Sequence, residues 1–82
     1  MILVDIYIPV INETYDFELN ENVPVGETME VLSDIISKKM KNPLKVQSDT
    51  FVLYSLEKKR ALESHLTLYQ NGIKDGNRLM LI

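Results

Sequence analysis

The chain has 82 residues, of which 45% are hydrophobic and 26% are charged, and it contains no cysteine. This length leaves room for one hydrophobic core, and we therefore expect one domain, residues 1–82, with the composition of an ordinary folded globule. The missing cysteines exclude disulfide bonds and thiolate metal sites, and a reducing cytoplasm is the simplest location.

Charge is unevenly distributed along the chain. Residues 1–34 carry eight acids and no base, a formal charge of −8, whereas residues 35–82 carry nine bases and four acids, +5, which together give the net −3. An acidic chain without a basic stripe is not expected to bind nucleic acid. A structural explanation is that acids early in the predicted helix and bases late in it suit the helix dipole and allow an Asp34–Lys38 ion pair. The alternative is that the uneven charge creates an electrostatic field that steers a binding partner.

Two runs of alternating apolar residues predict a pair of antiparallel strands. In the first, Ile2 to Val10, every second residue is apolar. In the second, Tyr15, Phe17 and Leu19 would point inward, after a hairpin-length connection. The first run contains Asp5, lacks a basic leader region and is too short to cross a bilayer, so we expect neither a signal peptide nor membrane insertion.

A helical period follows between Val25 and Met40. Pro24 stands just before it, where the missing N–H costs nothing, and Asn42-Pro43 closes it, because a residue before proline resists the helical conformation. The apolar positions of this stretch are Val25, Met29, Leu32, Ile35, Ile36 and Met40.

Three further strands are predicted after the helix. Phe51 to Leu56 is rich in β-formers, residues 57–60 turn the chain back toward Ala61-Leu62, and Arg78 to Ile82 is an apolar strand preceded by two glycine turns. Strands before and after a helix are expected to lie parallel with a right-handed crossover. The predicted fold is α+β, a β-grasp with a mixed sheet of four to five strands packed on one main α-helix.

Four apolar residues of the second half recur at a fixed spacing: Leu62, Leu68, Ile73 and Leu79. This spacing resembles that of ubiquitin-like domains. The similarity extends to residues 15–19, to Pro24-Val25 and to the final strand, and over nearly the whole chain the sequence resembles the YukD/EsaB family. This family consists of stand-alone ubiquitin-like proteins associated with type VII (WXG-substrate) secretion in Gram-positive bacteria.

The resemblance implies a cytoplasmic accessory or regulatory protein of that secretion system. Ubiquitin and the sulfur carriers of the same fold end in a flexible Gly-Gly tail, whereas this sequence stops at Ile82. We therefore expect a non-conjugated protein rather than a modifier or sulfur carrier. The alternative is a ubiquitin-like scaffold or adaptor in an unrelated complex, since a fold does not fix a function.

Catalytic residues are hard to find in this sequence. There is no cysteine nucleophile, and His65 is the only histidine and has no carboxylate at a telling spacing. No Cys/His cluster could hold a metal, and no glycine loop suits a phosphate. We expect no enzyme activity, no cofactor and no metal site.

The candidate binding surface is the sheet face that points away from the helix. Apolar side chains on this face would form one patch that binds a protein, either a component of the secretion machinery or a second copy of the chain. A one-residue slip of the third strand would turn three of these side chains inward and leave a smaller patch. The candidate residues are Leu3, Tyr7, Val52, Tyr54, Leu56, Met80 and Ile82.

Basic residues occur in two places. Lys58-Lys59-Arg60 reads as a solvated hairpin tip, with an anion contact as the alternative. Lys38, Lys39, Lys41 and Lys45 are typical of a helix C-terminus.

Overall fold

A mixed five-stranded sheet and one long helix make up the fold in the computed structural model, which describes residues 1–39 and 51–82. The predicted order of the helix and strands is confirmed. The predicted helix end at Asn42-Pro43, together with Met40, Lys41 and Lys45, lies outside the described residues. The elements are β1 (Ile2–Ile8), β2 (Glu13–Leu19), α1 (Val25–Lys39), β3 (Leu53–Ser55), β4 (Arg60–Ala61) and β5 (Arg78–Leu81).

The strands are ordered β2-β1-β5-β3-β4 across the sheet. β1 and β5 are parallel, and every other neighbouring pair is antiparallel. The parallel pair lies at the centre because the chain crosses over through α1 before β5 returns beside β1. The predicted α+β fold of the β-grasp type, with a mixed sheet on one helix, is confirmed.

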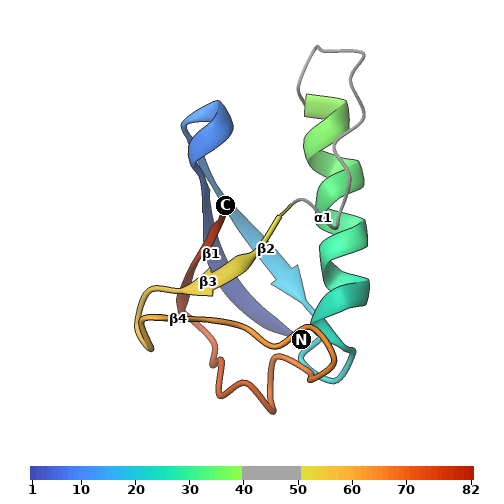
Figure 1. Ribbon diagram of the computed structural model, residues 1–82, viewed down its shortest axis with the longest axis vertical. Helices are drawn as coiled ribbons and strands as arrows, with labels where there is room; N and C mark the ends of the chain where they lie inside the picture. The colour runs from blue at the N-terminus through green and yellow to red at the C-terminus, as the bar shows by residue number, and fades with distance from the viewer. Residues whose placement is uncertain (40–50) are drawn as a thin grey trace.

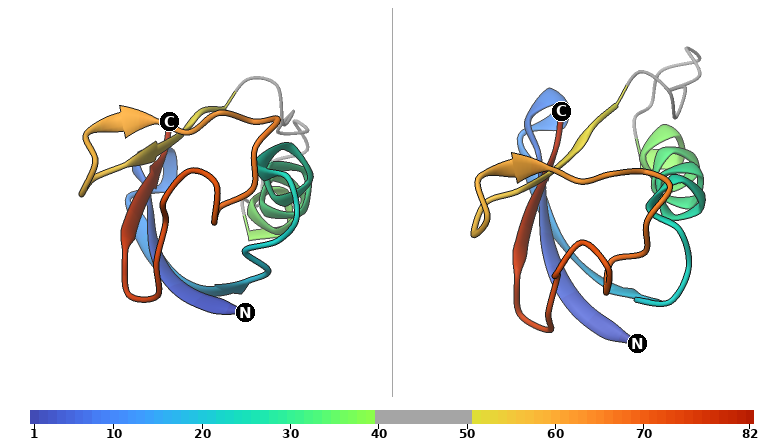
Figure 2. Two further views of the ribbon diagram at one scale, coloured as in Figure 1. Left: turned by 90° about the horizontal axis from the view of Figure 1, so that it is seen from below. Right: turned by 60° about the horizontal axis from the view of Figure 1, so that its bottom comes forward.

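The helix lies on one side of the sheet, and a long connection closes one end of the molecule (Figure 1). Figure 2 shows residues 62–77 passing the start of α1 before they return to β5. Two hydrogen bonds fix this passage: the Val25 N–H donates to the Leu66 carbonyl at 2.8 Å, and the Gly26 N–H donates to that of Ser64 at 2.9 Å. The start of the helix is therefore held by the connection.

The core lies between the sheet and the helix and is almost entirely aliphatic. Burying each such side chain contributes about 1.5–3 kcal/mol relative to leaving it in water. The buried members are Val4, Ile6, Ile8, Leu19, Val25, Met29, Leu32, Ile36, Leu53, Leu62, Leu68, Ile73, Leu79 and Leu81.

Two strands are shorter than their sequence patterns predict. β1 ends at Ile8 because Pro9, which has no N–H, begins a 3₁₀ turn, Pro9–Ile11, that Asn12 ends in a left-handed conformation. β3 covers only Leu53–Ser55, although Val52 and Ile82 still exchange two backbone hydrogen bonds beyond it.

The glycine turns before β5 have a structural explanation. Gly72 and Gly76 have φ angles of +76° and +85°, which glycine adopts without strain. Between them, Ile73 enters the core, and Asp75 Oδ1 accepts a hydrogen bond of 2.7 Å from the Leu3 N–H. The Gly-Ile-x-Asp-Gly segment therefore anchors β1 against the start of β5.

Candidate protein-binding face

Three adjacent strands, β1, β5 and β3, present alternate side chains to the face opposite α1. In β3, Leu53 and Ser55 point into the core and are at most 2% exposed, whereas Val52 is 48% exposed. The one-residue slip is therefore contradicted, and the alternation in β1 and β5 is equally regular. On this open face lie Leu3, Tyr7, Val52, Tyr54, Leu56, Met80 and Ile82.

A row of three large side chains crosses the middle of the open face. The strand register pairs Met80 in β5 with Tyr7 in β1 and with Tyr54 in β3. All three side chains are half-buried, although they lie on the side of the sheet opposite α1 (Figure 1). The Tyr7 hydroxyl donates a hydrogen bond of 3.1 Å to Asn12 Oδ1, which orients the ring. We name Tyr7, Met80 and Tyr54 the central row.

The central row is extended at one side and interrupted at the other. Val52 and Ile82 follow it along β3 and β5 and are about half exposed. In the other direction, Asp5 of β1 pairs with Arg78 of β5. These two polar residues separate Leu3 from the central row, because alternation puts them on the same face. The expected patch is thus continuous only without Leu3.

A hollow of about 230 Å³ lies beside the central row. Its apolar side is provided partly by Leu56, whose N–H donates to the Arg78 carbonyl at 3.1 Å and so fixes this residue next to β5. The hollow is a place where a partner side chain can enter the face. It is lined by Asp5, Tyr7, Thr14, Leu56, Arg78 and Leu79.

Two carboxylates, Asp5 and Asp16, face each other across β1 and β2 next to this hollow. The hydrogen bond that they share raises the pKa of Asp5 above its usual value of 3.8, and their mutual repulsion raises it further. The Arg78 charge acts in the opposite direction. The lining of the hollow therefore carries one acidic and one basic side chain, Asp5 and Arg78.

Glu57 holds Arg78 in place. The Arg78 N–H donates to Glu57 Oε1 at 2.6 Å, and its Nε donates to Oε2 at 3.2 Å. The hydrogen bond from the Arg78 backbone contributes most to lowering the pKa of Glu57 below its usual value. The charge of Arg78 is therefore compensated within the protein.

The basic hairpin tip has a packing role. A Cβ on Gly72 would lie 2.6 Å from Lys58 Cε, so the lysine side chain covers this glycine. Arg60 Nη2 donates to the Asn71 carbonyl at 3.3 Å. Both contacts tie the tip to the connection before β5, which supports the structural interpretation of these cations.

Other sequence candidates lie apart from this face. His65 is exposed, and its Nε2 is 3.8 Å from Glu63 Oε2. Within residues 1–39 and 51–82, no group of His, Asp or Glu is arranged to hold a metal ion. In the same ranges, no helix is long and apolar enough to cross a membrane.

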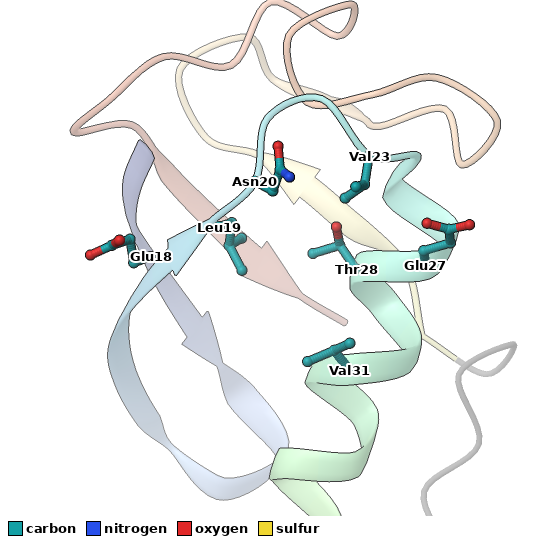
Figure 3. A pocket seen from close by; sticks show the side chains of 7 residues that line it. All are labelled: Glu18, Leu19, Asn20, Val23, Glu27, Thr28 and Val31. Carbon is teal, nitrogen blue, oxygen red and sulfur yellow. The ribbon is translucent and has the colours of Figure 1, made fainter. Parts of the chain in front are cut away.

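A second hollow, of about 310 Å³, lies between the end of β2 and the first half of α1 (Figure 3). Sequence reasoning did not anticipate it. The signal was Val31, an apolar helix residue outside the buried stripe, which is 57% exposed. Its lining residues are Glu18, Leu19, Asn20, Val23, Glu27, Thr28 and Val31.

Solved structures with a similar backbone are ubiquitin-like. The ubiquitin of Caldiarchaeum subterraneum is 27% identical, with a TM-score of 0.74 over 99% of this chain and 90% of that chain. The EccD5 ubiquitin-like domain from Mycobacterium xenopi is 18% identical, with a TM-score of 0.77 over 99% and 91%. The N-terminal ubiquitin-like domain of the 4931431F19Rik protein is 23% identical, with a TM-score of 0.77 over 99% and 72%.

Sequence comparison gives a more specific result. No curated protein matches the chain significantly. The family model described as "WXG100 protein secretion system (Wss), protein YukD", however, matches residues 3–81, nearly the whole chain. The chain therefore belongs to the YukD family, the ubiquitin-like proteins of the WXG100 secretion system.

Proposed function

We propose that the chain is a cytoplasmic protein-binding module that serves the WXG100 secretion system as an accessory or regulatory component. Its binding surface is the open sheet face, with the central row in the middle. The proposal assigns it no catalytic step, since His65 is exposed and the described residues group no metal ligands.

One observation carries this proposal: Tyr7, Met80 and Tyr54 lie side by side on the sheet face opposite α1. Open faces of mixed and antiparallel sheets are normally polar, so an apolar row at the centre favours a contact surface. Aromatic residues and methionine are enriched at the centres of protein interfaces. The hollow beside the row offers a partner side chain a place to anchor.

The test is capture of secretion components by the tagged chain, comparing wild type with Met80→Glu and Val10→Glu. Val10 is 60% exposed in the 3₁₀ turn and serves as the matched control. A buried Met80 contributes about 2 kcal/mol, so its replacement by a charge should weaken binding about thirtyfold. Circular dichroism and urea unfolding verify that both variants remain folded.

The expected result is that wild type and Val10→Glu retain a component of the secretion machinery and Met80→Glu loses it. Equal capture by all three would remove the open face as the binding surface. Capture of an unrelated complex, lost with Met80→Glu, would favour the adaptor function over a role in secretion.

A further inference from the structure

β2 is an edge strand of the sheet. Its residues Glu13–Leu19 pair with β1 along one side. Edge strands present unpaired N–H and C=O groups that can accept a further strand, and proteins usually protect them. Within residues 1–39 and 51–82, no strand pairs with the outer side of β2.

The direction of the β1 hydrogen bonds shows which β2 residues have free backbone groups. In β1, Leu3 and Asp5 use their backbone groups toward β5 and the turn before it: the Asp5 N–H donates to the Asn77 carbonyl, and the Leu3 carbonyl accepts from Gly76. Val4, the residue between them, must therefore direct its backbone N–H and C=O groups toward β2. By the same alternation, Thr14, Asp16 and Glu18 direct their N–H and C=O groups outward, away from β1.

An apolar hollow lies directly beside this edge. Figure 3 shows Thr28 and Val31 of α1 and Val23 of the preceding loop pointing toward Leu19 at the end of β2. Val31 is 57% exposed, so its aliphatic surface is open to a ligand. Glu18 points to the opposite side of β2, as strand alternation requires.

The charged residues that line the hollow, Glu18 and Glu27, are both acidic. Residues 1–34, which contain both walls of the hollow, carry eight acids and no base. Strand alternation puts Asp16 on the same side of β2 as Glu18, and Glu27 lines the hollow from α1 (Figure 3). The nearest helix cation at the other end of β2, Lys39, has its Nζ 4.6 Å from the Tyr15 ring centroid and ties the helix to the strand there.

We propose that the outer edge of β2 and the hollow beside α1 form a second docking site, which takes an extended segment of a partner protein in which basic and aliphatic residues alternate. The segment adds a strand to β2 through the free backbone groups of Thr14, Asp16 and Glu18. Cross-strand neighbours point to the same face. Its aliphatic residues therefore enter the hollow beside Leu19, and its basic residues lie beside Asp16 and Glu18.

This site is independent of the open-face proposal, because it uses a strand edge and a helix rather than the central row. Strand addition takes affinity from main-chain hydrogen bonds and selectivity from alternate side chains. The acids exclude an acidic segment, since like charges directly opposite one another across strands are unfavourable. The acidic first part of the chain would therefore select a basic partner segment over an acidic one.

The test uses a short synthetic peptide of alternating lysine and isoleucine, mixed with the isotope-labelled chain at low salt. Its matched control has glutamate in place of lysine. We expect chemical shift changes at Glu18, Thr28 and Val31, together with slower hydrogen exchange at the Thr14, Asp16 and Glu18 amides. The glutamate peptide should bind about tenfold more weakly or not at all.

Two peptide variants separate strand addition from simple charge attraction. In one variant the backbone nitrogens of the lysine residues carry methyl groups, and in the other the backbone nitrogens of the isoleucine residues carry them. Because backbone N–H groups alternate in direction along a strand, only one of the two variants should lose binding. Equal affinity of both variants, or unchanged exchange at Thr14, Asp16 and Glu18, would overturn the proposal.

Variants of the chain provide a second arm. Val31→Lys removes aliphatic surface from the hollow and adds a cation, so binding of the lysine–isoleucine peptide should weaken about tenfold. Val10→Lys makes the same change at a similarly exposed valine outside the hollow, and Met80→Glu changes the open face; both should bind like wild type. Unchanged binding by Val31→Lys, or loss by Met80→Glu, would contradict a site at β2 and α1.

Discussion

The open face and the outer edge of β2 belong to one sheet, yet they offer a partner different groups. In the centre of the sheet, the backbone of β5 is bonded on both sides, to β1 and to β3, so only side chains such as the central row can recognise a ligand. At the β2 edge, the outward backbone groups pair with no other strand of residues 1–39 and 51–82. As proposed binding surfaces, the first would select a partner by the shape of its side chains, whereas the second would require an extended chain.

Their electrostatics differ for a similar reason. On the open face, Glu57 compensates the charge of Arg78, so the contact proposed there is mainly apolar. Along β2 and the first half of α1 there is no cation in the sequence. Asp16 is where the two surfaces meet: its side chain lies beside Asp5, and its backbone points to the free edge. Substitutions on either side of this boundary test the distinction.

The largest effect is expected where both surfaces rest on the same core. Leu32 is fully buried, and its neighbour Val31 is 57% exposed. Leu32→Ala should lower the free energy of unfolding by about 3 kcal/mol because it leaves a cavity, whereas Val31→Ala should change it by less than about 0.5 kcal/mol. Urea unfolding of the two variants measures the difference, and equal losses would mean that Val31 belongs to the core.

A smaller effect is expected at Asn71, whose side chain is buried. Its amide donates to the carbonyls of Glu63 and Thr67, and its oxygen accepts from the Glu63 N–H. Asn71→Ala leaves these groups without partners and should cost about 1–3 kcal/mol. Hydrogen exchange should quicken at Val25, whose N–H donates to the Leu66 carbonyl of the same connection, more than at Met80.

The exposed Asn22 provides the control for this loss. Asn22→Ala should leave both the stability and the exchange pattern nearly unchanged. Equal acceleration at Val25 and Met80 in Asn71→Ala would show that the connection before β5 supports both surfaces to the same extent.

Removing the Glu57 carboxylate should have a modest, pH-dependent effect. Hydrogen bonds from Arg78 lower the pKa of Glu57 in the folded state. Its stabilisation is therefore present above the unfolded pKa of about 4.5 and is lost as the pH falls through the lower, folded value. Glu57→Gln should be less stable than wild type at neutral pH, and the gap should narrow on acidification. Unfolding midpoints measured from neutral to acidic pH check this stability difference. Glu30→Gln, at an exposed helix position, is the control.

The smallest effect is expected at Asp16. Asp16→Asn removes the carboxyl group whose shared hydrogen bond and negative charge raise the pKa of Asp5, so the pKa of Asp5 should move back toward 3.8. In wild type the folded pKa of Asp5 is raised, so the related stability is present below the unfolded pKa and is lost as the pH rises through the folded value. Asp16→Asn should therefore lose less stability than wild type as the pH rises from the unfolded to the folded pKa of Asp5.

An NMR titration of the Asp5 carboxyl carbon measures this shift directly. Asp34→Asn, which removes the partner of Lys38 on the helix, should leave the Asp5 titration unchanged. An unaltered Asp5 pKa in Asp16→Asn would show that the carboxylates do not interact across β1 and β2. Asp16→Asn should also weaken binding of the lysine–isoleucine peptide by only a few fold, because the Glu18 carboxylate remains.

The sequence by itself determined the elements and the core. Apolar residues recur with a period of two in the strands that contain Ile6 and Leu79, and with a helical period in the segment that contains Leu32. These periods predict which side chains are buried, since local geometry alone decides the face on which a side chain lies. The sequence also predicted that Tyr7 and Met80 face away from the helix, whereas the facing of Tyr54 stayed open until the structure showed Leu53 and Ser55 buried.

Only the tertiary structure decided what surrounds these residues. That Asp5 and Arg78 divide Leu3 from the central row depends on the register between two strands more than seventy residues apart in sequence. The hollow between Leu19 and Val31 depends on where α1 lies beside the edge of the sheet. Register and packing arise from contacts between distant segments, and no local pattern in the chain carries that information.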